Sequence, residues 1–381
     1  MSNVLNYLRR YDRLRMLVYR FRRKVNRQLD LAHRRIVSYN RIVSLDANRK
    51  SIPGLSSYTA IPYDREFIGR AAALSGEFVQ EPQREIFVCS FTKVDLQVET
   101  GALAVSGNKL IAESATESIS LQASVRSYVR CPEPIEHLSG ATYATIMTHH
   151  RNYFHWFTDT LPRLYLLDAL KLDTPVKLLV PTNLKLHHLT SLMWCLPANF
   201  SVEFVEADRW LTVENLYFPS LVRTRTSNYL PKEALDFVRN AAFRHVPLAP
   251  VLKPGRRIYI SRSKDARRCV LNEQDVRACL TQFGFEVVYA QELTVEEQVS
   301  LFHTAEWIVA PHGAGLTNML FGEHLRILEF IHDPSPYMYF SRLASILGHE
   351  HHYIPAKQKR KDDDMLVDVA GLERKLVELR A

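Results

Sequence analysis

In the second half of the chain, short continuous apolar runs alternate with longer stretches in which apolar residues recur every three or four positions. Short apolar runs at Arg257–Ser261, Trp307–Pro311 and Arg326–Phe330 predict buried β-strands. Between them, residues 272–283 and 294–304 carry apolar side chains every three or four positions, which predicts helices. Asn272 is the expected N-cap of the first helix and Gly284 its stop, and Thr294 with Glu297 forms the expected capping box of the second. Strands that alternate with helices form a parallel sheet covered on both faces, so we expect an α/β architecture here.

The first half has a different pattern. Residues 51–140 alternate between apolar and polar side chains, which predicts a β-rich region, and residues 150–170 switch to a helical period. Three prolines within residues 247–254 predict a linker. These patterns divide the chain into a basic helical segment at residues 1–50, an N-terminal lobe at 51–250, a C-terminal lobe at 251–355, and a charged turn with a C-terminal helix at 356–381.

Positive charge is concentrated near the N-terminus. The net charge is +8, and residues 1–50 contain 14 Lys and Arg against 3 Asp and Glu. Residues 4–29 carry an apolar stripe at helical spacing, with most basic residues outside it. Such a helix can lie on an anionic membrane surface, or it can pack against the protein or within an oligomer. It matches no groove-reading motif and has few aromatic side chains for stacking, so we expect no nucleic-acid partner.

Composition and cysteine content indicate a globular protein of a reducing compartment. Hydrophobic residues make up 46% of the chain and charged residues 24%. We find no apolar run of about 18 residues and no apolar signal core, so we expect a cytoplasmic protein, peripheral on the inner face of the membrane if the basic helix binds lipid. The five cysteines are scattered and lack CxxC spacing, which favours reduced thiols.

A glycine-rich turn follows the predicted strand at Trp307–Pro311. It reads His312-Gly313-Ala314-Gly315-Leu316-Thr317-Asn318. Glycines allow close approach of the backbone to a ligand, and the start of the next helix offers N–H groups and a positive dipole end to a diphosphate. A tight turn without a ligand would carry the same residues. The motif is neither a dinucleotide fingerprint, which needs a third glycine, nor a P-loop.

Charged residues of the neighbouring strands converge on the same edge of the predicted sheet. Arg262 and Arg268 follow the strand Arg257–Ser261, and arginine binds phosphate oxygens through paired hydrogen bonds. Glu329 lies among apolar neighbours, and a buried carboxylate needs a partner. A ribose diol would serve, as would an internal arginine or a backbone amide.

A second polar cluster occupies residues 149–163. In a helix, His155 and Asp159 lie four positions apart on one face, and an Asp beside a His can act as a general base for a hydroxyl. The same pair fits an amphipathic helix in which Asp159 caps the next helix and His155 is an interior residue. The chain has no HExxH motif and adjacent histidines point to different faces, so we expect no metal site.

Three segments resemble glycosyltransferase family 61. They are HHRNYFHWFTDTLPRL at residues 149–164, RRIYISRSKDARRCVLNE at 256–273, and the segment 285–321 that contains the glycine-rich turn. The resemblance implies a GT-B-like fold, in which two Rossmann-like lobes face a cleft. It also implies a donor sugar nucleotide on the C-terminal lobe, an acceptor on the N-terminal lobe, inversion of configuration and no metal ion.

The resemblance also implies roles for single residues. Asp159 matches the family's aspartate and would act as the base, oriented by His155. The implied donor-binding residues are Arg262, Arg268, His312, Gly313, Ala314, Gly315, Leu316, Thr317 and Asn318. From its place in the neighbouring strand we add Glu329 to the donor site, and from the second polar cluster we expect His150, Asn152, Trp156 and Arg163 on the acceptor side.

We therefore expect an inverting, metal-independent glycosyltransferase that needs no cofactor. It would move a sugar from a UDP-sugar to a glycan or glycolipid acceptor in cell-surface or capsular polysaccharide synthesis. Two other functions fit the same features: a nucleotide-sugar epimerase of similar fold, and a non-catalytic module that binds sugar nucleotides or polysaccharide. An epimerase would need no acceptor, and a binding module would show no turnover.

Overall fold

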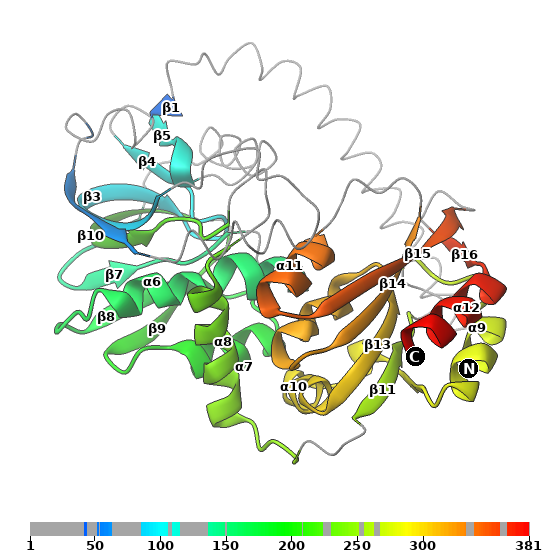
Figure 1. Ribbon diagram of the computed structural model, residues 1–381. Coiled ribbons are helices and arrows are strands. Elements are labelled where there is room, and N and C mark those ends of the chain that lie inside the picture. Colours follow the sequence, from blue (N-terminus) through cyan, green and yellow to red (C-terminus); the bar gives the residue numbers. More distant parts are fainter. Residues whose placement is uncertain are drawn as a thin grey trace, which may run out of the picture.

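The computed structural model describes residues 42–43, 52, 54–62, 85–105, 109–114, 136–148, 151–207, 209–223, 230–250, 255–262, 267–332, 339–358 and 364–380. These residues form a mixed α/β structure with one sheet in each half of the molecule (Figure 1). The amphipathic helix expected at residues 4–29 lies outside the described residues, as does His150.

The second sheet has six strands in the order β12-β11-β13-β14-β15-β16. The strands are β11 (Arg256–Ile260), β12 (Glu286–Val288), β13 (Ala305–Pro311), β14 (Arg326–His332), β15 (Glu350–Gln358) and β16 (Met365–Val367). The first five run parallel, and β16 is antiparallel to β15. The chain leaves β11 for one neighbour and returns to β13 on the other side. This is a topological switch point, where open α/β sheets bind ligands at the carboxyl ends of the strands.

Alternate residues of these strands enter two separate cores. On one face, Tyr259 and Val309 pack with helices α9 (Glu273–Gln282) and α12 (Val369–Arg380). On the other face, Ile260 and its neighbours pack against helices that face the first half. These are α10 (Val295–His303), the 3₁₀ helix η6 (Ala314–Phe321) and α11 (Tyr339–Leu347). Burial on both faces is the arrangement expected of a parallel sheet.

Local signals in the sequence are confirmed in one helix and wrong in another. Helix α10 begins with the capping box expected at Thr294, whose Oγ1 accepts from the amide of Glu297 at 3.2 Å while the Glu297 carboxylate accepts from the Thr294 amide at 2.7 Å. Asn272 makes no cap with its side chain, which instead bonds both backbone groups of Val367. The C-terminal helix expected from Met365 begins at Val369, because the preceding residues pair as β16.

The first sheet has ten strands, of which eight lie in the order β1-β5-β4-β3-β10-β7-β8-β9. The strands are β1 (Ile42–Val43), β2 (Leu55–Ile61), β3 (Ile86–Gln97), β4 (Leu103–Val105), β5 (Lys109–Ile111), β6 (Glu136–Leu138), β7 (Thr142–Ala144), β8 (Val176–Pro181), β9 (Phe200–Val205) and β10 (Trp210–Pro219). Strands β10, β7, β8 and β9 run parallel, whereas β3 is antiparallel to β2, β4 and β10. The first half therefore departs from a plain Rossmann-like lobe.

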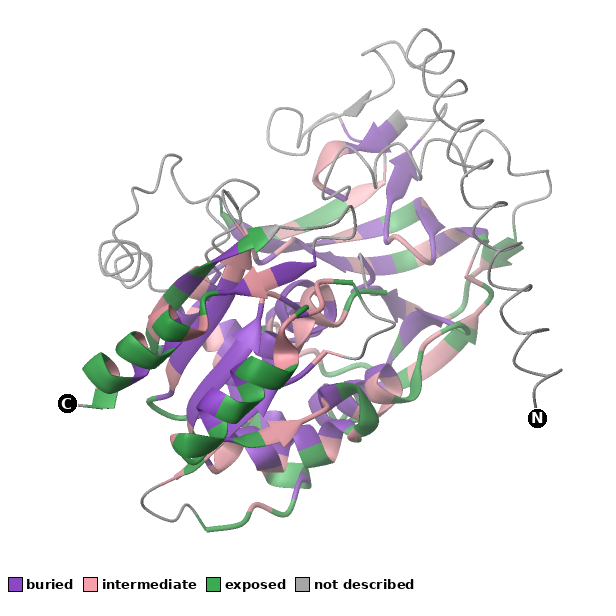
Figure 2. Ribbon diagram, turned by 90° about the vertical axis from the view of Figure 1, so that its right-hand side faces the viewer, coloured by how far each residue is buried: buried purple, intermediate pink, exposed green. Residues whose placement is uncertain are grey.

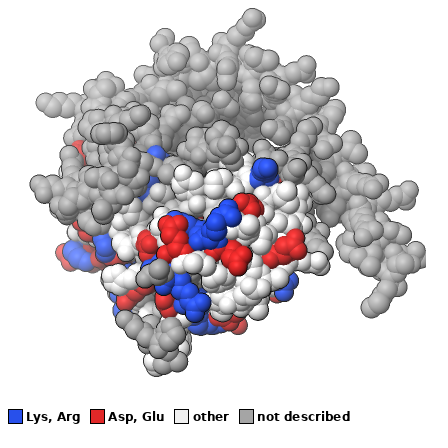
Figure 3. Space-filling model, turned by 45° about the vertical axis from the view of Figure 1, so that its right-hand side comes forward, with Lys and Arg blue, Asp and Glu red and all other residues white. Residues whose placement is uncertain are grey.

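A continuous hydrophobic core joins the two halves. It contains side chains of α6 (Arg163–Ala169), α7 (Leu186–Cys195) and α8 (Lys232–His245) together with side chains of α10, η6 and α11. Figure 2 shows that buried residues fill the sheets and the inner faces of these helices. The sequence pattern did not reveal α8, whose buried face is largely alanine and therefore weakly apolar. On the surface drawn in Figure 3, acidic and basic side chains of the described residues are intermixed.

Candidate active site

A π-helical turn carries the first polar cluster. Helix α5 (Tyr153–His155) continues as the π-helix η4 (Trp156–Thr160), which closes with a bond of 2.9 Å from the amide of Leu161 to the carbonyl of Trp156. Pro162 follows, and a proline has no N–H and crowds the carbonyl four residues earlier, so the wider turn suits this position. Helix α6 then begins after Pro162, as the sequence predicts. π-Turns of this kind are frequent at functional sites.

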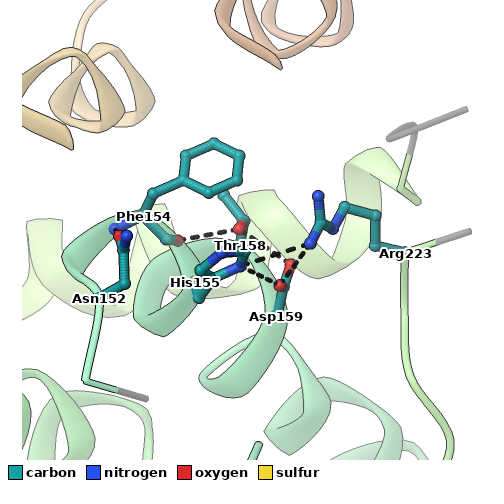
Figure 4. Close-up of polar contacts among 6 residues, drawn as sticks. All are labelled: Asn152, Phe154, His155, Thr158, Asp159 and Arg223. Carbon is teal, nitrogen blue, oxygen red and sulfur yellow. Dashed lines mark hydrogen bonds and ion pairs between the residues drawn. The ribbon is translucent and has the colours of Figure 1, made fainter. Parts of the chain in front are cut away.

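The turn presents an aspartate bound by three neighbours (Figure 4). Oδ2 of Asp159 lies 2.6 Å from Nδ1 of His155 and 2.8 Å from Nη2 of Arg223. Oδ1 accepts a hydrogen bond of 3.0 Å from the Thr158 hydroxyl. The side chain of Asp159 is 8% exposed and that of His155 25% exposed, so the imidazole is the more accessible member of the pair.

The environment of Asp159 fixes its charge. Burial raises the pKa of this carboxyl, but the Arg223 guanidinium and the His155 imidazole outweigh burial and hold the pKa at about 2. The carboxylate is therefore ionised near neutral pH and can only accept hydrogen bonds. It follows that Nδ1 of His155 donates to Asp159, which leaves the lone pair of the imidazole on Nε2.

Two of the expected acceptor-side residues lie in the interior instead. Trp156 is fully buried, and its indole N–H donates to the Ser191 hydroxyl at 2.8 Å. Arg163 is 1% exposed and donates to backbone carbonyls, including those of Ile146 and Met147 at 2.8 Å each. Both side chains build the scaffold beneath the site, because neither reaches its surface.

Asn152 has a local role that the sequence did not predict. Its side-chain oxygen accepts from the amide of Phe154 at 2.9 Å, so it is the N-cap of α5. The residue itself is exposed, beside the start of the π-turn. The structure therefore leaves Asn152 at the rim of the site.

The glycine-rich turn lies at the carboxyl end of β13, next to the carboxyl end of β11. A Cβ atom at Gly313 would overlap Nη1 of Arg262, so only glycine lets the guanidinium lie against this backbone. The helix that follows is 3₁₀, where the sequence predicted a short α-helix. His312, Ala314 and Gly315 are partly exposed, so these three residues form the accessible part of the turn.

Three arginines gather at this turn. Nε of Arg262 donates to the carbonyl of Arg267 at 2.6 Å, and Nη1 of Arg268 donates to the carbonyl of His312 at 3.3 Å. Burial, followed by the charges of Arg268 and Arg267, lowers the pKa of Arg262. Of the residues that the structure describes, none offers Arg262 a carboxylate. A bound anion would relieve this repulsion.

The inner side of the turn is closed by protein contacts. Leu316, Thr317 and Asn318 are buried. Oδ1 of Asn318 accepts from the hydroxyl of Tyr153 at 2.6 Å, and Nδ2 donates to Gln298 at 2.6 Å. Asn318 therefore ties the turn to α5 in the other half, and the side chains of Leu316, Thr317 and Asn318 lie in the interior.

Glu329 satisfies its carboxylate within the protein. Oε1 lies 2.5 Å from Nδ1 of His312, and Oε2 lies 2.9 Å from Nε2 of His351. The side chain is 2% exposed. Of the partners considered from sequence, an internal one is present, although it is a pair of histidines. The carboxylate is not presented to a ribose diol.

Aromatic side chains place the two clusters beside each other. The His312 ring lies 5.1 Å from the ring of Phe340, which lies 5.5 Å from the ring of Phe154. Phe154 in turn precedes His155, and Arg223 lies over its ring at 5.7 Å. Figure 1 shows α11, which carries Phe340, between the two halves. The glycine-rich turn and the turn that carries His155 are therefore linked by a chain of aromatic contacts.

Comparison with known proteins agrees with this arrangement. Residues 153–327 match the family model Glycosyltransferase 61. This region of the chain, a little under half of its length, is therefore similar to glycosyltransferase family 61. The region that matches the family begins at α5 and ends in β14, so it contains Asp159, Arg223, Arg262 and the glycine-rich turn. Glu329 and His351 lie beyond its end.

Two proteins illustrate the similarity. Beta-1,2-xylosyltransferase XAX1 of Oryza sativa subsp. japonica is 29% identical over 206 residues, which are 49% of this chain and 36% of that protein. The chain thus matches about a third of the length of this relative. A solved structure of the dodecameric iron-containing heptosyltransferase TibC with ADP-D-beta-D-heptose has 8% identity and a TM-score of 0.29. That match covers 65% of this chain and 75% of TibC.

The sequence did not reveal two residues of the candidate site. Arg223 lies 64 positions after Asp159 in the chain, shortly after the end of β10, and no local sequence pattern connects the two residues. Arg267 sits in an arginine-rich stretch beside Arg268, and spacing alone did not distinguish it. Among the described residues, no group of three or more His, Cys, Asp and Glu is arranged to hold a metal ion. Nor does that part of the chain contain a helix long and apolar enough to cross a membrane.

Proposed function

We propose that this chain is a glycosyltransferase that transfers a sugar from a UDP-sugar to a hydroxyl group of a glycan or glycolipid. The observation that carries the proposal is the junction of two chemically different sites. An arginine-lined glycine turn at a sheet switch point lies beside an aspartate-bound histidine. The first suits a diphosphate and the second suits the activation of a hydroxyl.

The donor would bind with its diphosphate at the turn. Arg262 and Arg268 approach the turn from β11, and His312, Ala314 and Gly315 are accessible at its surface. When the bond to the sugar breaks, negative charge develops on the departing nucleotide, and preorganised cations stabilise it. Fixed guanidinium groups can supply this charge without a metal ion, which supports our proposal of a metal-independent reaction in a GT-B-like arrangement.

The acceptor hydroxyl would be activated by His155. The sequence suggested Asp159 as the base, but a carboxylate with a pKa of about 2 has little affinity for a proton near neutral pH. The imidazole of His155 can take a proton on Nε2 while Nδ1 donates to Asp159, and it is the more exposed of the two side chains. Asp159 would orient the imidazole and stabilise the imidazolium once the proton has moved. Attack by the activated hydroxyl in one displacement would invert the anomeric centre.

The transferred sugar and the acceptor class are inferred from the rice relative and from the basic segment. The name of the rice relative suggests transfer of a pentose, and a hexose would fit the same chemistry. The basic segment at residues 4–29 would favour work on a membrane surface, as in capsular or other cell-surface polysaccharide synthesis.

A binding and product assay tests the function. We expect UDP to raise the melting temperature of the wild-type protein equally with magnesium and with EDTA, and to have little effect on Arg262→Ala. Incubation with donor alone should give slow release of UDP and free sugar. An epimerised donor would support an epimerase, and binding without release of UDP, with or without acceptors, would indicate a binding module.

A further inference from the structure

The buried cluster of Glu329, His312 and His351 is the most unusual charged group outside the His155 site. Its carboxylate is 2% exposed, and the two imidazoles are 11% and 8% exposed. A buried carboxylate needs a compensating positive charge. Among the described residues, the groups that contact this carboxylate are the two imidazoles.

The hydrogen bonds identify which imidazole nitrogens carry protons. Burial raises the pKa of Glu329, but hydrogen bonds from His312 and His351 and their charges lower it further than burial raises it. The carboxylate is therefore an acceptor only, so Nδ1 of His312 and Nε2 of His351 donate to it. Nε2 of His312 has no hydrogen-bond partner among the described residues.

His312 opens the glycine-rich turn, so this nitrogen belongs to the proposed diphosphate site. Its surroundings are cationic or apolar: Arg268 bonds its carbonyl, Arg262 lies against Gly313, and Phe340 of α11 packs on its ring. The carboxylate of Glu329 is the negative charge that touches the imidazole. A carboxylate that accepts from one imidazole nitrogen can balance the positive charge of the ring when the other nitrogen donates to an anion.

Building on the proposed function, we propose that Glu329 and His351 are positioning residues that make His312 a cationic hydrogen-bond donor to the diphosphate. Glu329 fixes the ring through Nδ1 and balances the positive charge that forms when Nε2–H binds a phosphate oxygen. His351 holds the second carboxylate oxygen and so keeps Glu329 in place. No bond other than hydrogen bonds is made or broken.

The contrast between UDP and uridine tests this proposal. Glu329→Gln keeps the shape of the side chain and removes its charge, so we expect it to weaken UDP binding about tenfold and to leave uridine binding unchanged. Glu350→Gln is the matched control, because Glu350 also pairs with a histidine on β15 but lies at the surface with Arg326. We expect Glu350→Gln to bind both compounds like the wild type.

Imidazole NMR gives a second readout that does not depend on affinity. In the wild type with UDP, nitrogen-15 spectra should show both ring nitrogens of His312 protonated, and in Glu329→Gln they should show a neutral ring. An unchanged UDP-to-uridine ratio in Glu329→Gln, or a neutral His312 ring in the wild-type complex, would overturn the proposal while leaving the transferase function intact. Failure of the wild type to bind any nucleoside diphosphate would overturn both.

Discussion

Each half of the molecule contributes a buried carboxylate paired with an imidazole, but the second partner differs. In the first half, Asp159 binds His155 at 2.6 Å and Arg223 at 2.8 Å. In the second half, Glu329 binds His312 at 2.5 Å and a second histidine at 2.9 Å. Partners lower the pKa of both carboxyl groups against the effect of burial.

The second partner decides what the imidazole can do. A guanidinium is charged at all working pH values, so Arg223 neutralises Asp159 whether or not His155 carries a second proton. A histidine carries charge only when it is protonated, so Glu329 favours a proton on one of its two imidazoles. We therefore expect the carboxylate–imidazole pair of the first half to act as a base through His155. We expect the pair of the second half to bind phosphate as a cation through His312.

Replacement of the proposed base should have the largest effect. We expect His155→Gln to reduce kcat by about 10²–10⁴-fold, the range of general-base catalysis, and to leave the KM for the donor unchanged. Steady-state transfer assays with saturating acceptor would measure this. The surface variant His352→Gln should retain wild-type rates. A His155→Gln enzyme with normal kcat would exclude His155 as the base.

Arg163 supports the first site as a buried cation whose hydrogen bonds go to backbone carbonyls. Burial lowers its pKa to about 9, and its donors satisfy carbonyls of residues 146, 147, 219 and 220. Arg163→Met would leave several buried carbonyls without a donor, so we expect a loss of about 3 kcal/mol in the free energy of unfolding. Urea unfolding at pH 7 would measure the loss, and a change below about 0.5 kcal/mol would contradict this role.

Removal of Arg223 should make the Asp159–His155 pair behave like the Glu329–His312 pair. In Arg223→Gln, the carboxylate of Asp159 would be balanced by a proton on His155, which blocks the base near neutral pH. We expect transfer to fall about tenfold at pH 7 and to recover as the pH rises. The pH–rate profile measures this, and a uniform loss at all pH values would show that Arg223 acts in another way.

His349 shows the behaviour of a buried imidazole without a carboxylate. Burial lowers its pKa to about 4, and the neutral ring accepts from the amide of Leu325 through Nδ1 and donates to the carbonyl of Met319 through Nε2. As the pH falls, this histidine is protonated near pH 6.5 in the unfolded chain but only near pH 4 in the folded protein. The contribution of the neutral His349 ring to the free energy of unfolding is therefore present above pH 6.5 and is lost as the pH falls toward 4.

We therefore expect the wild type to lose about 2–3 kcal/mol of stability between pH 6.5 and 4 through this residue. In His349→Gln this part of the loss should be absent. Thermal unfolding across that pH range measures the difference between the two proteins. Parallel curves for the two proteins would show that the ring titrates normally in the fold.

The sequence predicted the parallel half of the fold well, since apolar runs, the capping box at Thr294 and the stop at Gly284 are local signals. It also predicted His155 and Asp159 as neighbours and placed Arg262 at the glycine-rich turn. Helix α8 was missed because alanine gives a weak apolar pattern. The antiparallel strands of the first sheet were not resolved either, since pairing direction depends on distant segments.

The sequence predicted which segments lie near the candidate site better than it predicted the role of each side chain in them. Trp156 and Arg163 belong to a motif that resembles an active site, yet they are buried, and burial depends on strands far away in sequence. Arg223 could not be assigned, because the contact that lowers the pKa of Asp159 spans 64 positions. The partner of Glu329 was left open for the same reason, since His351 comes from the next strand.

The central claim is that the turn at His312 binds a diphosphate through Arg262. Calorimetric titration of UDP into the wild type and Gly313→Ala tests it most directly, because a Cβ atom at this position would displace the Arg262 guanidinium. We expect measurable UDP binding by the wild type and at least tenfold weaker binding by Gly313→Ala, with both proteins folded. Equal affinity of the two proteins for UDP, or no binding by either, would contradict it.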